Sequence, residues 1–115
     1  MSDERTVFKK IIDGDIPANV VYQDEYCMAF YDLTPQAPTH VLLIPKKEIE
    51  NIDAVTEQDA QILGHMMTKV SEIANLLNLE NGYRVVANCG DDGGQSVNHL
   101  HFHILGGRAL AWPPG

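Results

Sequence analysis

The sequence is poor in cysteine, in positive charge and in long hydrophobic runs, and each scarcity argues against a class of protein. Cys27 and Cys89 are the only cysteines, and both lie in strand-like runs, so we expect buried free thiols rather than a disulfide framework. Eight basic residues stand against sixteen acidic ones, giving a net charge of −8, which disfavours binding to long DNA or RNA. No apolar run approaches the roughly 20 residues of a transmembrane helix, so no membrane partner is expected.

The remaining composition is that of one globular domain. Residues 1–5, Met-Ser-Asp-Glu-Arg, are polar, so we expect no signal peptide and a cytoplasmic location. Of the 115 residues, 44% are hydrophobic and 21% charged, which is typical of a folded domain, here predicted to span residues 1–115.

The strongest functional signal is a row of histidines at alternate positions, His99, His101 and His103, with apolar residues between them. Because successive side chains of a strand point to opposite faces, an extended segment here places all three imidazoles on one face. A strand does not need histidines to fold. They could be surface residues without a role, ligands of a metal, or a covalent nucleophile with supporting imidazoles.

The metal interpretation has specific weaknesses. Two imidazoles at i and i+2 can share a zinc ion, but a further ligand would have to come from elsewhere, with His40, Asp32 and Cys89 as candidates. The chain has neither the C-x-x-C nor the H-E-x-x-H spacing. We therefore expect neither a metal nor another cofactor.

A glycine-rich segment, Gly-Asp-Asp-Gly-Gly-Gln-Ser at residues 90–96, directly precedes the histidines. Glycines let a ligand approach the backbone, so successive N–H groups can bind an anion. The segment lacks the Gly-Lys-Ser/Thr ending of a P-loop, and a plain hairpin connection is the alternative. A phosphate bound there would lie beside three nitrogen bases, which favours the nucleophile interpretation.

The chain pattern predicts an α+β fold. Apolar residues at 7, 8, 11 and 12 indicate a short helix that ends before Gly14 and Pro17. A capping box of Thr56 and Asp59 opens one long helix, which Asn81-Gly82 ends. On this helix we expect Met66 and Met67 to pack into the hydrophobic core, and His65 to be an incidental residue. Five antiparallel strands are expected at residues 19–23, 27–32, 40–45, 83–89 and 98–105.

Residues 99–105, His-Leu-His-Phe-His-Ile-Leu, resemble the signature of the histidine-triad (HIT) family. Residues 8–16, 29–47, 93–96, 106–108 and 112–115 extend the similarity to the Hint branch, the histidine-triad nucleotide-binding proteins. The resemblance implies a HIT-like fold with a five-stranded antiparallel sheet, one long helix and one short helix. It also implies a homodimer that joins two sheets, in which the tail at 112–115 reaches towards the partner's site.

The resemblance further implies a hydrolase of nucleotide P–N bonds, which cleaves an adenosine 5′-monophosphoramidate to AMP and an amine. His101 would be the nucleophile that forms a nucleotidyl-histidine, and the His99 carbonyl would fix its tautomer. His103 would bind the phosphoryl oxygens and Ser96 would assist the leaving group. N–H groups of Gly94 and Gln95 would stabilise the developing charge.

The same resemblance assigns nucleoside contacts. Asp32 would hold the ribose hydroxyls, Asn88 would contact phosphate or ribose, and His40 would order the site. Leu33 would wall the pocket for a purine base, with weaker candidates at Phe8, Ile11, Phe30 and Leu42.

Two other functions remain open at this point. The third triad residue is histidine, where the nucleotidyltransferase branch has glutamine, which favours hydrolysis over transfer. A dinucleoside polyphosphate hydrolase is one alternative, and a nucleotide-binding adaptor with vestigial catalysis is the other. Cys89, Asn98 and Ala111 depart from many relatives at positions that could change leaving-group preference.

Overall fold

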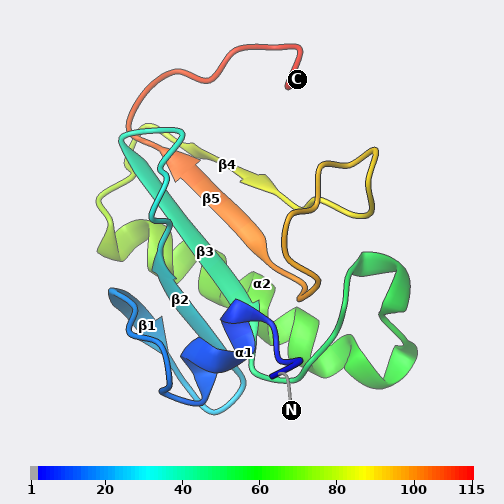
Figure 1. The fold of residues 1–115 in the computed structure, drawn as a ribbon. Coiled ribbons are helices and arrows are strands. Elements are labelled where there is room, and N and C mark those ends of the chain that lie inside the picture. The colour runs from blue at the N-terminus through cyan, green and yellow to red at the C-terminus, as the bar shows by residue number, and fades with distance from the viewer. Residues whose placement is uncertain (1–2) are drawn as a thin grey trace.

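The computed structural model describes residues 3–115; Met1 and Ser2, which belong to the polar start considered above, lie outside the described residues. It confirms the predicted α+β fold, with five antiparallel strands in the spatial order β1-β2-β3-β5-β4 and one principal helix (Figure 1). The elements are α1 (Val7–Ile12), β1 (Val20–Gln23), β2 (Cys27–Tyr31), β3 (Thr39–Pro45), α2 (Ala60–Leu76), β4 (Tyr83–Val86) and β5 (Phe102–Gly106). Two short 3-10 turns, Ile52–Ala54 and Glu57–Asp59, precede α2.

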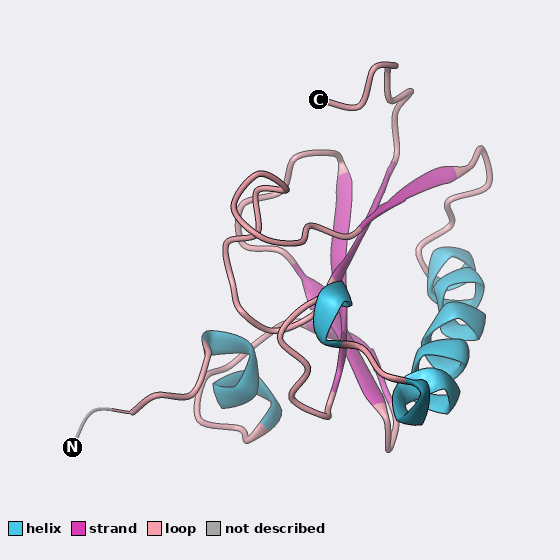
Figure 2. Cartoon of the chain, turned by 90° about the vertical axis from the view of Figure 1, so that its right-hand side faces the viewer, coloured by secondary structure: helices cyan, strands magenta, loops and turns pink. Residues whose placement is uncertain are grey.

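The sheet separates two layers, with α2 on one side and α1 on the other (Figure 2). Strand β3 lies at the centre, and His40 and every residue after it to Pro45 are buried. Alternate residues of β3 face opposite layers, because strand side chains alternate. Val41 and Leu43 therefore pack towards α2, whereas Leu42 and Ile44 pack towards α1.

Each layer has its own hydrophobic core. Beneath α2 the buried residues are Cys27, Ala29, Val41, Leu43, Met66, Val70, Ile73 and Ile104. Beneath α1 they are Phe8, Met28, Phe30, Leu42 and Ile44. The second core is smaller, and it borders the histidine row.

The helix boundaries differ in part from those expected. The side chain of Thr6 caps α1 by accepting the Lys9 N–H. Thr56 and Asp59 form the predicted capping box, but it caps the 3-10 turn Glu57–Asp59 that leads into α2 rather than α2 itself. However, α2 ends at Leu76, because Asn78 has a left-handed φ of 58° that terminates the helix. Residues 81–82 instead form the turn into β4, where Gly82 adopts a φ of 102°.

Two expectations about burial were wrong. Met66 is fully buried as predicted, but Met67 is 46% exposed because it lies on the solvent side of α2. Both cysteines are free thiols, yet only Cys27 is buried, and Cys89 is partly exposed because β4 ends before it. Within residues 3–115, none of the helices combines the length and hydropathy needed to cross a membrane.

Candidate active site

The three histidines lie at and just before the start of β5. The predicted strand at 98–105 is too long, since β5 begins only at Phe102 and His99 and His101 precede it. The imidazoles nevertheless gather on the α1 side of the sheet. The ring of Phe8 lies 6.2 Å from that of His99 and 5.0 Å from that of His101, and the His101 and His103 rings are 5.0 Å apart.

The backbone fixes the tautomer of His101. Nδ1 of this ring lies 2.7 Å from the carbonyl oxygen of His99. A carbonyl can only accept, so Nδ1 carries the proton and the neutral ring keeps its lone pair on Nε2. His101 is only 3% exposed and lines a cavity. In its neutral form the side chain thus presents the lone pair of Nε2 at a sheltered surface, as a nucleophile or general base requires.

A second chain of hydrogen bonds fixes the tautomer of His103. The Gln36 N–H donates to Nδ1 of His40 over 3.0 Å, so a neutral His40 carries its proton on Nε2. That nitrogen lies 2.8 Å from Nδ1 of His103. His103 therefore accepts on Nδ1 and holds its own proton on Nε2. In contrast to His101, this ring offers a donor.

Burial favours the neutral forms of His40, His99 and His103. Desolvation lowers the pKa of His103 to about 4, helped by the neighbouring His101 and His40. Burial also lowers the pKa of His40, and that of His99, whose Nε2–H donates to the Pro45 carbonyl over 2.8 Å. At neutral pH His103 is consequently a neutral hydrogen-bond donor rather than a cation.

Asp32 lies between the histidines and the chain turn that follows β2. Its Oδ1 accepts a hydrogen bond from the Thr34 N–H over 2.7 Å. This contact to the backbone two residues later is common for aspartate in turns. Its Oδ2 lies 3.5 Å from Nε2 of His40. Because Asp32 also lines the cavity, its carboxylate is placed both to hold the turn and to accept from a ligand.

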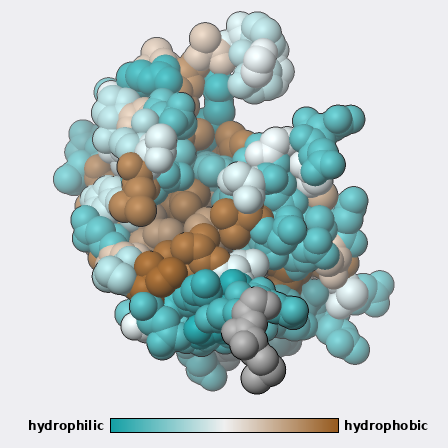
Figure 3. Space-filling view, viewed as in Figure 1, coloured by the Kyte–Doolittle hydropathy of each residue, from teal (hydrophilic) through white to brown (hydrophobic). Residues whose placement is uncertain are grey.

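A cavity of about 250 Å³ opens beside the imidazoles. Apolar side chains gather on this face of the molecule (Figure 3). The cavity is apolar along α1 and polar at the histidines, a division that suits a ligand with one flat apolar part and one charged part. Its walls include the expected residues Phe8, Ile11, Phe30, Asp32, Leu33, Leu42, Ser96, His101 and His103. Leu33 stands at 98% exposure.

The glycine-rich loop is ordered mainly by its own hydrogen bonds. The N–H of Gly94 donates to the Asp91 carbonyl and that of Gln95 to the Gly90 carbonyl, over 3.0 and 3.1 Å. Both N–H groups are thus occupied, and a phosphate contact from either would require the loop to rearrange. The amide of Asn88 donates to the Gly93 carbonyl over 2.6 Å. Of the expected loop residues, Ser96 reaches the cavity wall, whereas Gly94 and Gln95 do not. Asn88, which was expected on the strand at 83–89, does not reach it either.

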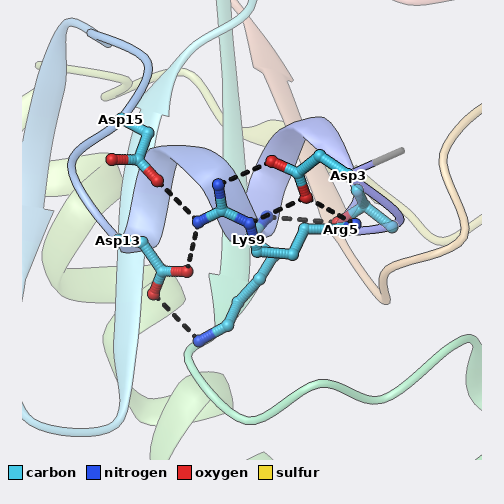
Figure 4. A network of polar contacts seen from close by, with 6 residues as sticks. Asp3, Arg5, Lys9, Asp13 and Asp15 are labelled. Atoms are coloured by element: carbon cyan, nitrogen blue, oxygen red, sulfur yellow. Dashed lines mark hydrogen bonds and ion pairs between the residues drawn. The ribbon is translucent and has the colours of Figure 1, made fainter. Parts of the chain in front are cut away.

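Sequence reasoning missed much of the cavity wall and the contacts that support it. Further wall residues are Val7, Ile16, Pro17, Ala18, Asn19, Tyr31 and Val97. The apolar pattern of the first helix could have indicated the wall residue on that helix, Val7. No pattern indicated that Arg5 binds Asp3, Asp13 and Asp15, at 2.6 to 2.9 Å, and so joins the two ends of α1 (Figure 4).

Comparison with known proteins agrees with this geometry. Residues 13–110 match the sequence model of the HIT domain. An uncharacterized HIT-like protein of Synechococcus elongatus is 53% identical over 97% of this chain and 98% of its own. A HIT family hydrolase from Legionella pneumophila has a TM-score of 0.94 and 46% identity, covering 96% of this chain and 100% of its own. A histidine triad nucleotide-binding protein from Candida albicans has a TM-score of 0.81 and 29% identity, covering 95% of this chain and 83% of its own. The chain belongs to the HIT domain family.

Proposed function

We propose that this protein hydrolyses the P–N bond of purine nucleoside 5′-monophosphoramidates through a covalent nucleotidyl-His101 intermediate. The observation that carries the proposal is the opposite protonation of two adjacent rings. His101 is held with a lone pair on Nε2, whereas His103 is held with a proton on Nε2. One ring can attack phosphorus while the other donates to an oxygen on the same phosphorus.

In the first step Nε2 of His101 attacks the α-phosphorus and the P–N bond breaks. The leaving amine takes up a proton, for which the hydroxyl of Ser96 on the cavity wall is the proposed donor. The His103 Nε2–H stabilises charge on the phosphoryl oxygens. The His99 carbonyl stabilises the positive charge that His101 acquires when its Nε2 forms the new bond.

In the second step water attacks the same phosphorus and gives a proton back to Ser96, the P–Nε2 bond breaks, and AMP leaves as His101 returns to its neutral form. Division into two displacements replaces one difficult step by two easier ones. His40 acts by holding the tautomer of His103 rather than by touching the substrate.

The cavity supports a nucleotide as the ligand. In this proposal the purine packs against Leu33 and the apolar wall along α1, and the Asp32 carboxylate accepts hydrogen bonds from the ribose hydroxyls. The similarity to the Candida albicans nucleotide-binding protein favours a nucleotide as the ligand, and the similarity to the Legionella pneumophila hydrolase favours hydrolysis as the reaction.

The direct test is mass spectrometry of protein that is mixed with an adenosine phosphoramidate and quenched rapidly. We expect an added nucleotidyl mass on the peptide that contains residues 99–105, and its absence from His101→Ala. An adaptor with vestigial catalysis predicts nucleotide binding without turnover. If His101→Ala retained wild-type turnover, the proposed mechanism would be wrong. Faster cleavage of a dinucleoside polyphosphate than of the phosphoramidate would instead favour the alternative substrate class.

We also propose a homodimer. Strand β4 is an edge of the sheet, and Tyr83 and Val85 on it are each 40% exposed. Exposed apolar edge strands are commonly covered by a partner. Arg84 donates to the carbonyls of Leu110 and Ala111, and so directs the tail that carries the 81% exposed Trp112. Sedimentation equilibrium should give twice the chain mass, and Val85→Lys should shift the species to monomer.

A further inference from the structure

A second cluster of reactive side chains lies in the α2 layer, on the other side of the sheet from the histidine row. Asp24 lies in the turn before β2, Cys27 begins β2, and His65 lies on α2. One donor atom from each lies within 4.8 Å of the others. Nε2 of His65 is 2.6 Å from Oδ2 of Asp24, and Sγ of Cys27 is 3.5 Å from Oδ1. The expectation that His65 is an incidental helix residue was therefore wrong.

The backbone and a neighbouring tyrosine hold the Asp24 carboxylate in place. The N–H groups of Tyr26 and Cys27 donate to Oδ1 over 2.8 and 3.0 Å, and the Tyr22 hydroxyl donates to Oδ2 over 2.7 Å. Hydrogen bonds of this kind orient the ligands of metal sites, and their loss typically lowers metal affinity about 10- to 100-fold.

A hollow of about 210 Å³ borders the cluster, lined by Tyr26, Gln61, Ile62 and His65. The His65 side chain is partly exposed, whereas Cys27 is fully buried. Of the three residues only His65 lines this hollow, so an ion would approach the cluster from the His65 side.

We propose that Asp24, Cys27 and His65 bind one zinc-class divalent ion. A thiolate, an imidazole and a carboxylate form a ligand set that suits zinc, with water in the fourth tetrahedral position. The sulfur ligand disfavours calcium and magnesium, which take oxygen. On binding, the Cys27 thiol releases its proton to solvent as the sulfur–metal bond forms.

The ion would join the β1–β2 turn to α2, two parts of the chain 41 residues apart. It binds only the folded chain, because the unfolded chain does not bring the three ligands together, and it should therefore raise the Tm. This role is independent of the hydrolysis proposed above.

The test is a titration of the full chain with Co²⁺, which reports thiolate coordination by a sulfur-to-metal charge-transfer absorption. We expect saturation at one equivalent in the wild type and in Cys89→Ser, and loss of the band in Cys27→Ser. Addition of Zn²⁺ should bleach the band by displacement. Ions held only by the imidazole row give no such band, so the two sites are distinguished.

Because serine at a fully buried position can itself unfold the chain, His65→Gln provides a second variant at a partly exposed position. We expect its cobalt affinity to fall at least about tenfold, and its Tm to lose the increase that Zn²⁺ gives the wild type. The proposal is overturned if the wild type shows no band. It is equally overturned if the band survives Cys27→Ser or His65→Gln unchanged, or disappears in Cys89→Ser.

Discussion

The carbonyl oxygen of His99 lies 2.7 Å from Nδ1 of His101. The tautomer of the proposed nucleophile therefore depends on the main chain of His99 and not on its side chain. The His99 side chain has a separate structural role, because it is buried and donates to the Pro45 carbonyl over 2.8 Å.

Replacement of His99 by alanine should thus separate stability from chemistry. The carbonyl that orients His101 is retained, so kcat for phosphoramidate turnover should fall less than about tenfold, far less than in His101→Ala. The free energy of unfolding should fall by roughly 1–3 kcal/mol, because the Pro45 carbonyl loses its buried partner. Urea denaturation and steady-state kinetics measure the two effects. A loss of kcat as large as that of His101→Ala would show that the imidazole of His99 takes part in the reaction.

The lowered pKa of His103 predicts a stability that depends on pH. Burial lowers this pKa from 6.5 to about 4, so between these values the unfolded chain binds more protons than the folded one. The contribution of neutral His103 to the free energy of unfolding is therefore fully present above about pH 6.5, and it is lost as the pH falls towards 4. The urea midpoint should decrease over this range. His103→Asn does not titrate at this position, so its midpoint should decrease less steeply; an equal decrease would contradict the assignment.

The sequence was sufficient for the fold class and for the spacing of the histidine row, because both depend on local periodicity. The alternation at 99–103 and the apolar stripe of α2 are read directly from residue spacing. The contacts of Gln36 with His40 and of Asp24 with His65 could not be predicted, because they join segments whose relative placement only the folded sheet defines. The loop at 90–96 shows a related limit. Its glycines predict a flexible anion site, yet the direction of each N–H depends on turn geometry that composition does not specify.

Asp32→Asn should reduce discrimination between ribose and deoxyribose. Asparagine keeps an oxygen to accept the Thr34 N–H, so the turn should be preserved. It loses the negative charge that strengthens hydrogen bonds from the ribose hydroxyls. Such charge-assisted hydrogen bonds contribute about 10- to 100-fold to affinity. The preference of kcat/KM for the ribonucleoside substrate over the 2′-deoxy substrate should fall by up to that factor. An unchanged preference, together with reduced kcat on both substrates, would show that Asp32 acts through His40 rather than by binding the sugar.

Arg5 should influence substrate binding although it lies outside the cavity. Its guanidinium binds Asp3 before α1 and Asp13 and Asp15 after it, and these contacts lower the pKa of Asp3 and raise that of Arg5. The helix between them supplies Phe8 and Ile11 to the cavity wall. Loss of the network should therefore loosen the wall that contacts the base, while the hydrogen bond between His101 and the His99 carbonyl is retained.

We expect Arg5→Gln to raise KM roughly two- to fivefold with kcat unchanged, because exposed ion pairs are individually weak. The difference from wild type should shrink near 1 M salt, where the screening length is only about 3 Å. Lys69→Gln is the matched control, since it removes the same charge from a Lys69–Glu72 pair on α2 that does not border the cavity. If both variants raised KM equally, net charge would explain the effect. If Arg5→Gln alone raised KM at low salt, the arginine that joins the two ends of α1 would be a determinant of nucleotide binding.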